Sequence, residues 1–207
     1  MLPNTVAKRS KAVAEQRLPM QSPRPGLVTL HPMIYPASLQ PTTRESLTLP
    51  SGRIVSFPKA TPTFPLWRGT PVDKTYGKKA VLDFNDRPAF AELAILWALQ
   101  NEGWNGVWVD SFRRAFRTGY WDRSPNGAPQ KSLPAKPSGI PEEIWNLAKI
   151  RSGVWDVFCW QDDRVLFCES KRGKRDRIRP SQLLFAESAL NAGLLRDSFL
   201  FVEWKTD

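Results

Sequence analysis

Residues 154–182 read VWDVFCWQDDRVLFCESKRGKRDRIRPSQ, and this stretch decides both the expected fold and the expected site. Two apolar runs flank Asp162-Asp163, and a two-residue turn at this dipeptide would pair the runs as antiparallel strands. In the resulting register, opposed residue numbers have a constant sum, which pairs Trp160 with Val165, Phe158 with Phe167, and Asp156 with Glu169.

Asp156, Glu169 and Lys171 therefore form a candidate site. Directly opposed Cβ atoms lie roughly 4.5–5.5 Å apart, and Lys171 projects from the same strand face as Glu169 because it stands two residues further on. Two adjacent carboxylates repel each other unless a positive charge lies between them. A divalent metal with one lysine would supply that charge, which indicates a metal-dependent phosphodiesterase.

The expected metal is Mg²⁺ or Mn²⁺. Magnesium suits one or two carboxylates, a backbone carbonyl and waters, which Asp156, Glu169 and the carbonyl of Ser170 would provide. Lys171 would either activate the attacking water or stabilise charge on the phosphoryl group, and the sequence leaves these two roles open. Gln182 would position a water or a phosphate beside the positive end of the next helix.

Glu92 is the candidate that lies furthest from this stretch. A helix is predicted over residues 87–100, with Asp86 as N-cap, Pro88 in its first turn and Gly103 just past its end. Glu92 shares the face of the apolar stripe, where an unpaired carboxylate is costly. It would reach the metal directly or through water, or instead pair with an arginine at the stripe's edge. The stripe consists of Ile95, Leu96 and Leu99.

The remaining elements follow from periodicity and punctuation. We expect a strand over residues 106–112 and a long basic loop over residues 113–140. A short helix would cover residues 141–150, with Pro141 at its start. A helix over residues 181–191 would follow, and a last strand over residues 198–204 would join the sheet. The helix over residues 181–191 would turn three leucines toward the core: Leu183, Leu184 and Leu190.

The charge of the chain favours a polyanionic partner. Its 207 residues carry a net charge of +10, which suits nucleic acid or an anionic membrane. The sequence has neither an apolar run long enough to span a bilayer nor a secretory signal. We expect a cytoplasmic protein without a membrane partner, associated with the nucleoid if it is bacterial. Two basic clusters are the candidate nucleic-acid contacts: Arg113, Arg114 and Arg117 in the long loop, and Arg172, Lys174, Arg175, Arg177 and Arg179 after Lys171.

The N-terminal third differs in composition from the rest. Pro recurs through residues 1–75, and the first 60 residues contain eight Lys or Arg against two Asp or Glu. We predict a partly ordered basic arm over residues 1–75, with short strands at 27–30 and 53–57, and one domain over residues 76–207. The arm and the insertion at 113–140 are each either nucleic-acid contacts or ordinary solvated segments, and a transit peptide is a weaker alternative for the first twenty residues.

The cysteine and histidine content excludes several chemistries. Cys159 and Cys168 lack a CxxC partner, so we expect reduced core residues and no structural zinc site. His31 is the single histidine and lies in a Pro-rich segment without plausible catalytic partners. A hydrolytic site would therefore rest on carboxylates and lysine.

These residues resemble the PD-(D/E)xK nuclease superfamily, and within it the VRR-NUC-like branch. The resembling stretch runs from about residue 86 to residue 204 and contains Glu92, the run Gly153-Val-Trp-Asp156, Glu169-Ser-Lys171, Asp176-Arg177-Ile178, and Gln182. The resemblance implies an α/β, restriction-endonuclease-like core with a mixed β-sheet flanked by helices. It also implies cleavage that leaves 5′-phosphate and 3′-hydroxyl ends, and often a homodimer that acts on branched or flapped DNA.

The leading hypothesis is thus a Mg²⁺-dependent endonuclease that hydrolyses DNA, with a preference for flaps or junctions. One alternative is a nucleic-acid-binding protein whose nuclease-like site is catalytically silent. Another is a nuclease that acts on RNA or on foreign nucleic acid.

Overall fold

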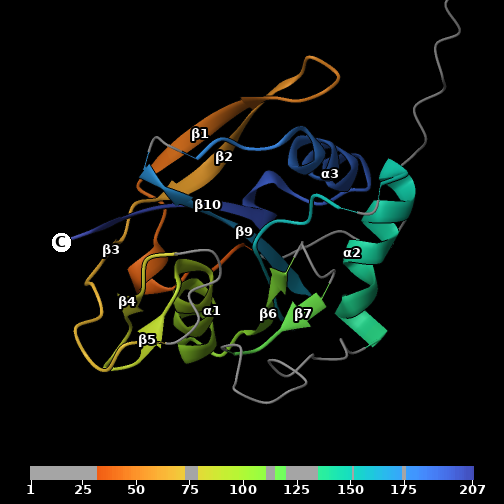
Figure 1. Cartoon of the computed structure of the whole chain (residues 1–207). Coiled ribbons are helices and arrows are strands. Elements are labelled where there is room, and N and C mark those ends of the chain that lie inside the picture. Colours follow the sequence, from red (N-terminus) through yellow and green to blue (C-terminus); the bar gives the residue numbers. More distant parts are fainter. Residues whose placement is uncertain (1–31, 73–78, 111–114, 120–134, 151, 174–175) are drawn as a thin grey trace, which may run out of the picture.

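A computed structural model describes residues 32–72, 79–110, 115–119, 135–150, 152–173 and 176–207 (Figure 1). The predicted strand at 27–30 and the basic residues Arg113, Arg114, Lys174 and Arg175 lie outside these ranges, as does most of the basic insertion.

One mixed sheet organises the described chain. It has eight strands in the order β1-β2-β10-β9-β8-β6-β7, with β3 paired to β10. Strand β10 runs parallel to both β2 and β9, whereas the hairpins β1–β2, β9–β8 and β6–β7 are antiparallel. The strands are β1 Thr43–Thr48, β2 Ile54–Ala60, β3 Thr63–Phe64, β6 Asn105–Asp110, β7 Ala115–Arg117, β8 Val157–Gln161, β9 Arg164–Arg172 and β10 Phe199–Thr206.

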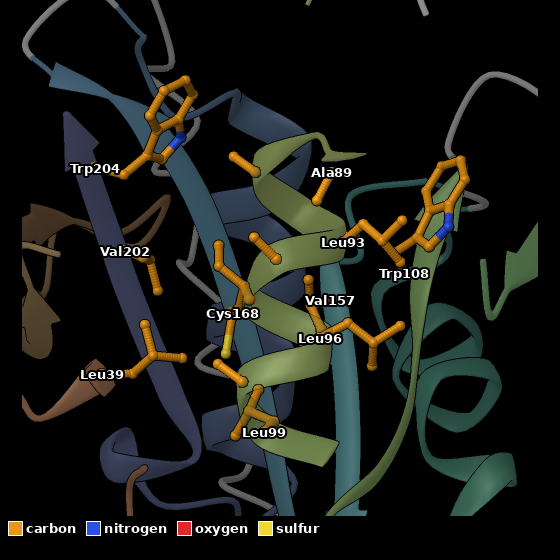
Figure 2. Packing of buried hydrophobic residues seen from close by; sticks show 14 of the residues in the cluster. Leu39, Ala89, Leu93, Leu96, Leu99, Trp108, Val157, Cys168, Val202 and Trp204 are labelled. Carbon is orange, nitrogen blue, oxygen red and sulfur yellow. The ribbon is translucent and has the colours of Figure 1, made fainter. Parts of the chain in front are cut away.

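Helices cover both faces of this sheet. Helix α1 (Ala91–Asn101) lies on one face, while α2 (Ala135–Ala148) and α3 (Pro180–Asn191) lie on the other (Figure 1). Figure 2 shows Leu93, Leu96 and Leu99 of α1 over the sheet. Side chains alternate along β9, so that Leu166 and Cys168 join the α1 core and the intervening aromatic residue joins the α3 core. The expected α/β fold, a mixed sheet flanked by helices, is confirmed.

The predicted hairpin and its register are confirmed. Phe158 lies opposite Phe167 and Trp160 opposite Val165. The two phenylalanine rings stack with centroids 4.8 Å apart, on the face covered by α3. Asp162 sits in the turn with a φ of 54°, which an aspartate tolerates better than most residues. A one-residue slip would send every buried side chain to the opposite face, so packing and turn specify the same pairing.

The predicted boundary at residue 75, between a partly ordered basic arm and a domain over residues 76–207, does not follow the sheet. The strand expected at 53–57 exists, but it is longer, and β1, β2 and β3 all belong to the central sheet. Phe57 is fully buried, and the centroid of its ring lies 5.8 Å from the ring centroid of Trp155. The physical reason is a non-local pairing: β2 finds its partner in β10, near the other end of the sequence.

The predicted start of the first helix is also wrong. Asn85 and Asp86 adopt positive φ angles of 51° and 60°, which are typical of a tight hairpin turn. They join β4 (Leu82–Asp83) to β5 (Pro88–Ala89), so Asp86 turns a hairpin instead of capping the helix. The end is as predicted, with Gly103 in the left-handed region just past α1.

Three further boundaries or faces need correction. The expected loop over 113–140 contains β7 and the first turns of α2, and Pro141 stands inside that helix instead of at its start. Helix α3 begins as expected, but its fully buried apolar residues are Phe185, Ala186 and Ala189. Of the three predicted core residues, Leu190 is partly buried and packs against the core, whereas Leu183 and Leu184 are only half-buried. Among the described residues, no helix is both long and apolar enough to cross a membrane.

Replacement of Phe57 tests whether the N-terminal strands are part of the core. Phe57→Ala should lower the free energy of unfolding by about 3–5 kcal/mol, the usual cost of removing a buried phenylalanine ring. Ile54→Ala, on the same strand but 70% exposed, should change it by less than about 0.5 kcal/mol. Urea denaturation measures both, and equal stability of the two variants would contradict the structure.

Candidate functional site

The predicted site residues converge where β8 and β9 meet the start of α3. Glu169 and Lys171 lie on β9, Asp156 directly precedes β8, and Gln182 belongs to the first turn of α3. The hairpin register explains why Glu169, Lys171 and Asp156 lie close together, because it places Asp156 at the level of Glu169 and Ser170. The backbone N–H of Ser170 donates to Asp156 Oδ2 at 3.0 Å.

Glu169 is the most enclosed of these groups. Its side chain is 2% exposed, so its carboxylate depends on neighbouring donors. Lys171 Nζ donates to Oε1 at 2.7 Å, and Gln182 Nε2 donates to Oε2 at 2.7 Å. Each carboxylate oxygen of Glu169 therefore accepts a hydrogen bond, one from Lys171 and the other from Gln182.

Lys171 and Gln182 are themselves held in place. Lys171 Nζ also donates to the carbonyl oxygen of Arg177 at 3.2 Å, which ties the segment after β9 to the site. Gln182 accepts a hydrogen bond from the backbone N–H of Arg179 at 2.9 Å, so its side-chain oxygen satisfies an amide at the start of α3. Each side chain thus has one defined orientation.

The segment before β8 packs closely against α3. Gly153 has a φ of 89°, and a Cβ atom there would lie 2.2 Å from the carbonyl oxygen of Ser181. The indole N–H of Trp155, which is fully buried, donates to the carbonyl oxygen of Gln182 at 3.5 Å. This close approach brings Asp156 and Gln182 to the same end of the sheet, and only glycine permits it at position 153.

Both carboxyl groups have raised pKa values. Burial is the largest cause for Asp156, and the negative charges of Glu169 and Glu92 raise its pKa further. The hydrogen bond from the Ser170 N–H and the positive charge of Lys79 lower it. Burial also raises the pKa of Glu169, while Lys171 and Gln182 oppose that rise. Perturbed carboxyl groups that meet beside polar donors are typical of functional sites.

Glu92 lies near enough to influence Asp156 but has its own partner. Its carboxylate forms an ion pair with Lys79, and its side chain is 13% exposed. The expected alternative partner was an arginine, so the partner's identity was wrong although the pairing is present. In the described ranges, no three His, Cys, Asp or Glu residues gather closely enough to hold a metal ion. A role for Glu92 as a ligand, direct or through water, stays a prediction.

The predicted nucleic-acid contacts lie in different places. Arg177 and Arg179 are exposed beside the site, as a role in phosphate binding requires, whereas Arg172 is exposed on the opposite face of β9, with its guanidinium group over the ring of Trp204. Arg117 is not available for such contacts, because it is 6% exposed and its Nε donates to Asp110 Oδ2 at 3.1 Å. Arg117 faces inward because β7 pairs with β6 and carries it into the structure.

Sequence reasoning missed the charged groups that extend the site along the sheet. Glu203 of β10 lies beside Lys171 in the strand register, and Lys59 of β2 forms ion pairs with Glu203 and with Glu45 of β1. The alternation in residues 198–204 could have placed Glu203 on the face of Phe201. Nothing local in the sequence could have placed Lys59 beside it.

The comparisons with known proteins leave the resemblance untested. No protein-family model matches the chain, and no curated protein or solved structure matches it either. The assignment to the PD-(D/E)xK nucleases therefore stays a prediction, and the site's geometry carries the functional argument.

Removal of the Asp156 charge should stabilise the fold at neutral pH. Because the folded pKa is raised above the ordinary value of 3.8, protonation of Asp156 favours the folded state. That stability is complete below the ordinary value and is lost as pH rises through the folded pKa. Asn at position 156 can still accept the Ser170 N–H. Each unit of the shift corresponds to about 1.4 kcal/mol.

Urea denaturation of the wild type and Asp156→Asn at pH 4 and pH 7.5 measures this effect. The variant should be more stable than the wild type at pH 7.5, and the difference should shrink at pH 4. Asp86→Asn, in the exposed β4–β5 turn, is the matched control and should show little difference. A variant that is less stable than the wild type at pH 7.5 would contradict the cause assigned here.

Proposed function

We propose that this chain is a metal-dependent endonuclease that hydrolyses phosphodiester bonds of DNA. The observation that carries the proposal is the convergence of two carboxyl groups and one lysine at a single point. Lys171 lies 2.7 Å from Glu169, and the backbone between them donates to Asp156. Carboxyl groups whose pKa values are raised by burial and by neighbouring charges are typical of functional sites, which favours a chemical role for this pair.

The residues present fit a magnesium ion of the kind that keeps most of its waters. Such an ion needs only one or two carboxylates together with substrate phosphate oxygens, and Asp156 and Glu169 provide two. Oδ2 of Asp156 accepts the Ser170 N–H. When bound, the ion would neutralise charge on the phosphoryl oxygens and lower the pKa of an attacking water. The carbonyl of Ser170 stays a predicted third ligand.

Lys171 and Gln182 are the chain's own contributions to the chemistry. Lys171 holds its ammonium group 2.7 Å from the Glu169 carboxylate, beside the position that a metal-bound phosphate would take. There it would stabilise developing negative charge, an effect worth about 10²–10³ in rate for one well-placed donor. Gln182 keeps Glu169 in place and lies at the positive end of α3, which attracts anions.

The surroundings support a polyanionic substrate. Arg177 and Arg179 are exposed next to the site, and the whole chain carries a net charge of +10. Contacts between arginines and phosphates give affinity that falls as salt concentration rises. The groups beside the site therefore favour a nucleic acid over a small phosphodiester.

A cleavage assay with Lys171→Ala tests the proposed chemistry. Wild-type protein should cut labelled duplex, flap, junction or single-stranded DNA in Mg²⁺ or Mn²⁺ and not in EDTA. Lys171→Ala should cut at least about 100-fold more slowly, while Lys205→Ala, an exposed lysine of β10, should cut like the wild type. Metal-dependent cutting that persists in Lys171→Ala would contradict the assigned role. DNA binding without cutting on any substrate would favour a catalytically silent binding protein. Cleavage of RNA but not of DNA in the same assay would identify a ribonuclease.

Metal-linked stability gives a second test, independent of activity. A ligand that binds only the folded state at 100 times its dissociation constant stabilises by about 2.7 kcal/mol, which raises Tm by roughly 5–10 °C in a chain of this size. Saturating Mn²⁺ should raise the Tm of the wild type in this way and leave that of Asp156→Asn nearly unchanged. Equal shifts in both proteins would place the metal elsewhere.

A further inference from the structure

A second lysine, Lys79, borders the site on the side that helix α1 covers. Its ammonium group forms an ion pair with Glu92, in the first turn of α1. The charges of both groups act on Asp156, whose pKa is raised by Glu92 and lowered by Lys79. Glu169 and Lys171 form the corresponding pair beside α3. Asp156 therefore has one lysine–carboxylate pair toward each of the two helix layers.

Buried aromatic rings help to position Lys79. Its Nζ lies 5.4 Å from the centroid of the Phe90 ring, within the range of cation–π attraction. Phe90 is buried, and its ring meets that of Trp108 edge to face with 5.0 Å between centroids. Figure 2 shows Trp108 beside the N-terminal half of α1. The rings and Glu92 together hold the ammonium group at one place, although it ends a long and flexible side chain.

The lysine is the outer group in both pairs. The side chain of Lys79 is 43% exposed and that of Glu92 is 13% exposed. Lys171 is likewise 13% exposed, above Glu169 at 2%. The carboxylates of both pairs thus lie beneath ammonium groups, so an anion that arrives from solvent meets positive charge first.

The hydrogen-bonding capacity of the two lysines suits a phosphodiester. An ammonium group has three donors, and the hydrogen bond from Lys79 to Glu92 takes one of them. A phosphodiester carries two non-bridging oxygens, which point in different directions from the phosphorus atom. A phosphate held at Asp156 would turn one of these oxygens toward Lys171 and the other toward Lys79.

We propose that Lys79 is a second phosphate-binding lysine of the site, which contacts the phosphate at Asp156 from the side opposite Lys171. The inference rests on the proposed function and adds a substrate contact to it. Lys79 lies outside both of the basic clusters that the sequence predicted. The competing explanation is that Lys79 serves only as the counter-ion of Glu92, and the two explanations differ in what DNA binding loses when Lys79 is replaced.

The salt dependence of DNA binding tests this contact. Fluorescent duplex and single-stranded DNA would be titrated with protein in EDTA, where no metal-dependent cutting occurs. Lys79→Ala should bind about tenfold more weakly, the loss expected for one charged hydrogen bond. The slope of log K against log salt concentration should also become shallower by about 0.7–0.9, the value for one phosphate contact.

Two further variants control for the loss of a charge. Lys79→Arg keeps a positive group at the same place and should keep the wild-type slope. Arg53→Ala removes one exposed positive charge at the far end of α3, where Arg53 contacts Asn191. This variant should also bind like the wild type.

Replacement of Glu92 separates phosphate binding from the counter-ion role. Glu92→Gln removes a negative charge and releases Lys79, so it should bind DNA more tightly than the wild type. Lys79→Ala in the Glu92→Gln background leaves no unpaired carboxylate at position 92, and it should still weaken binding about tenfold relative to Glu92→Gln alone. Absence of any further loss in that background would assign Lys79 to Glu92 alone and overturn the inference. Circular dichroism and Tm establish that each variant folds.

The outcomes separate this inference from the proposed function. Metal-dependent cutting by the wild type, together with an unchanged salt slope in Lys79→Ala, would overturn the role of Lys79 alone. A shallower slope in Lys79→Ala without cutting in any metal would support the phosphate contact and overturn the nuclease. A wild-type protein that binds neither form of DNA would overturn both.

Discussion

The buried carboxylate of Glu169 is the constraint on which the site depends. At 2% exposure it has lost almost all contact with water, and such a group is costly unless donors replace that water. Lys171 and Gln182 replace it, each at 2.7 Å. One donor comes from the same strand and the other from the next helix, so satisfying this one side chain fixes where β9 ends and where α3 begins.

The rest of the fold holds these pieces at that position. The stacked rings of Phe158 and Phe167 lie between the hairpin and α3 and keep the register that brings Asp156 to Ser170. Gly153 allows the chain before β8 to approach the start of α3. Strand β10 then joins the hairpin to the N-terminal strands and so places Lys59 and Glu203 beside the lysine of the site. The apolar core thus determines the geometry of its charged edge.

The sequence predicted the hairpin well because every local signal there agrees: two apolar runs, a turn dipeptide between them and opposed aromatic residues. It failed where pairing is distant or where one residue suits two structures. Asp86 is a good helix cap, yet a turn in the left-handed region uses it instead. Phe57 stands in a Pro-rich segment whose partner, β10, is remote in sequence. Arg117 was predicted to contact nucleic acid, because nothing nearby in the sequence indicates its buried ion pair with Asp110.

The location of a bound metal tests the central claim most directly. Crystals of the wild-type protein soaked in Mn²⁺ would be measured at a wavelength where manganese scatters anomalously. A peak is expected within bonding distance of carboxylate oxygens from both Asp156 and Glu169, with Lys171 Nζ beside it. A bound manganese ion elsewhere, with Glu169 still held only by Lys171 and Gln182, would contradict it.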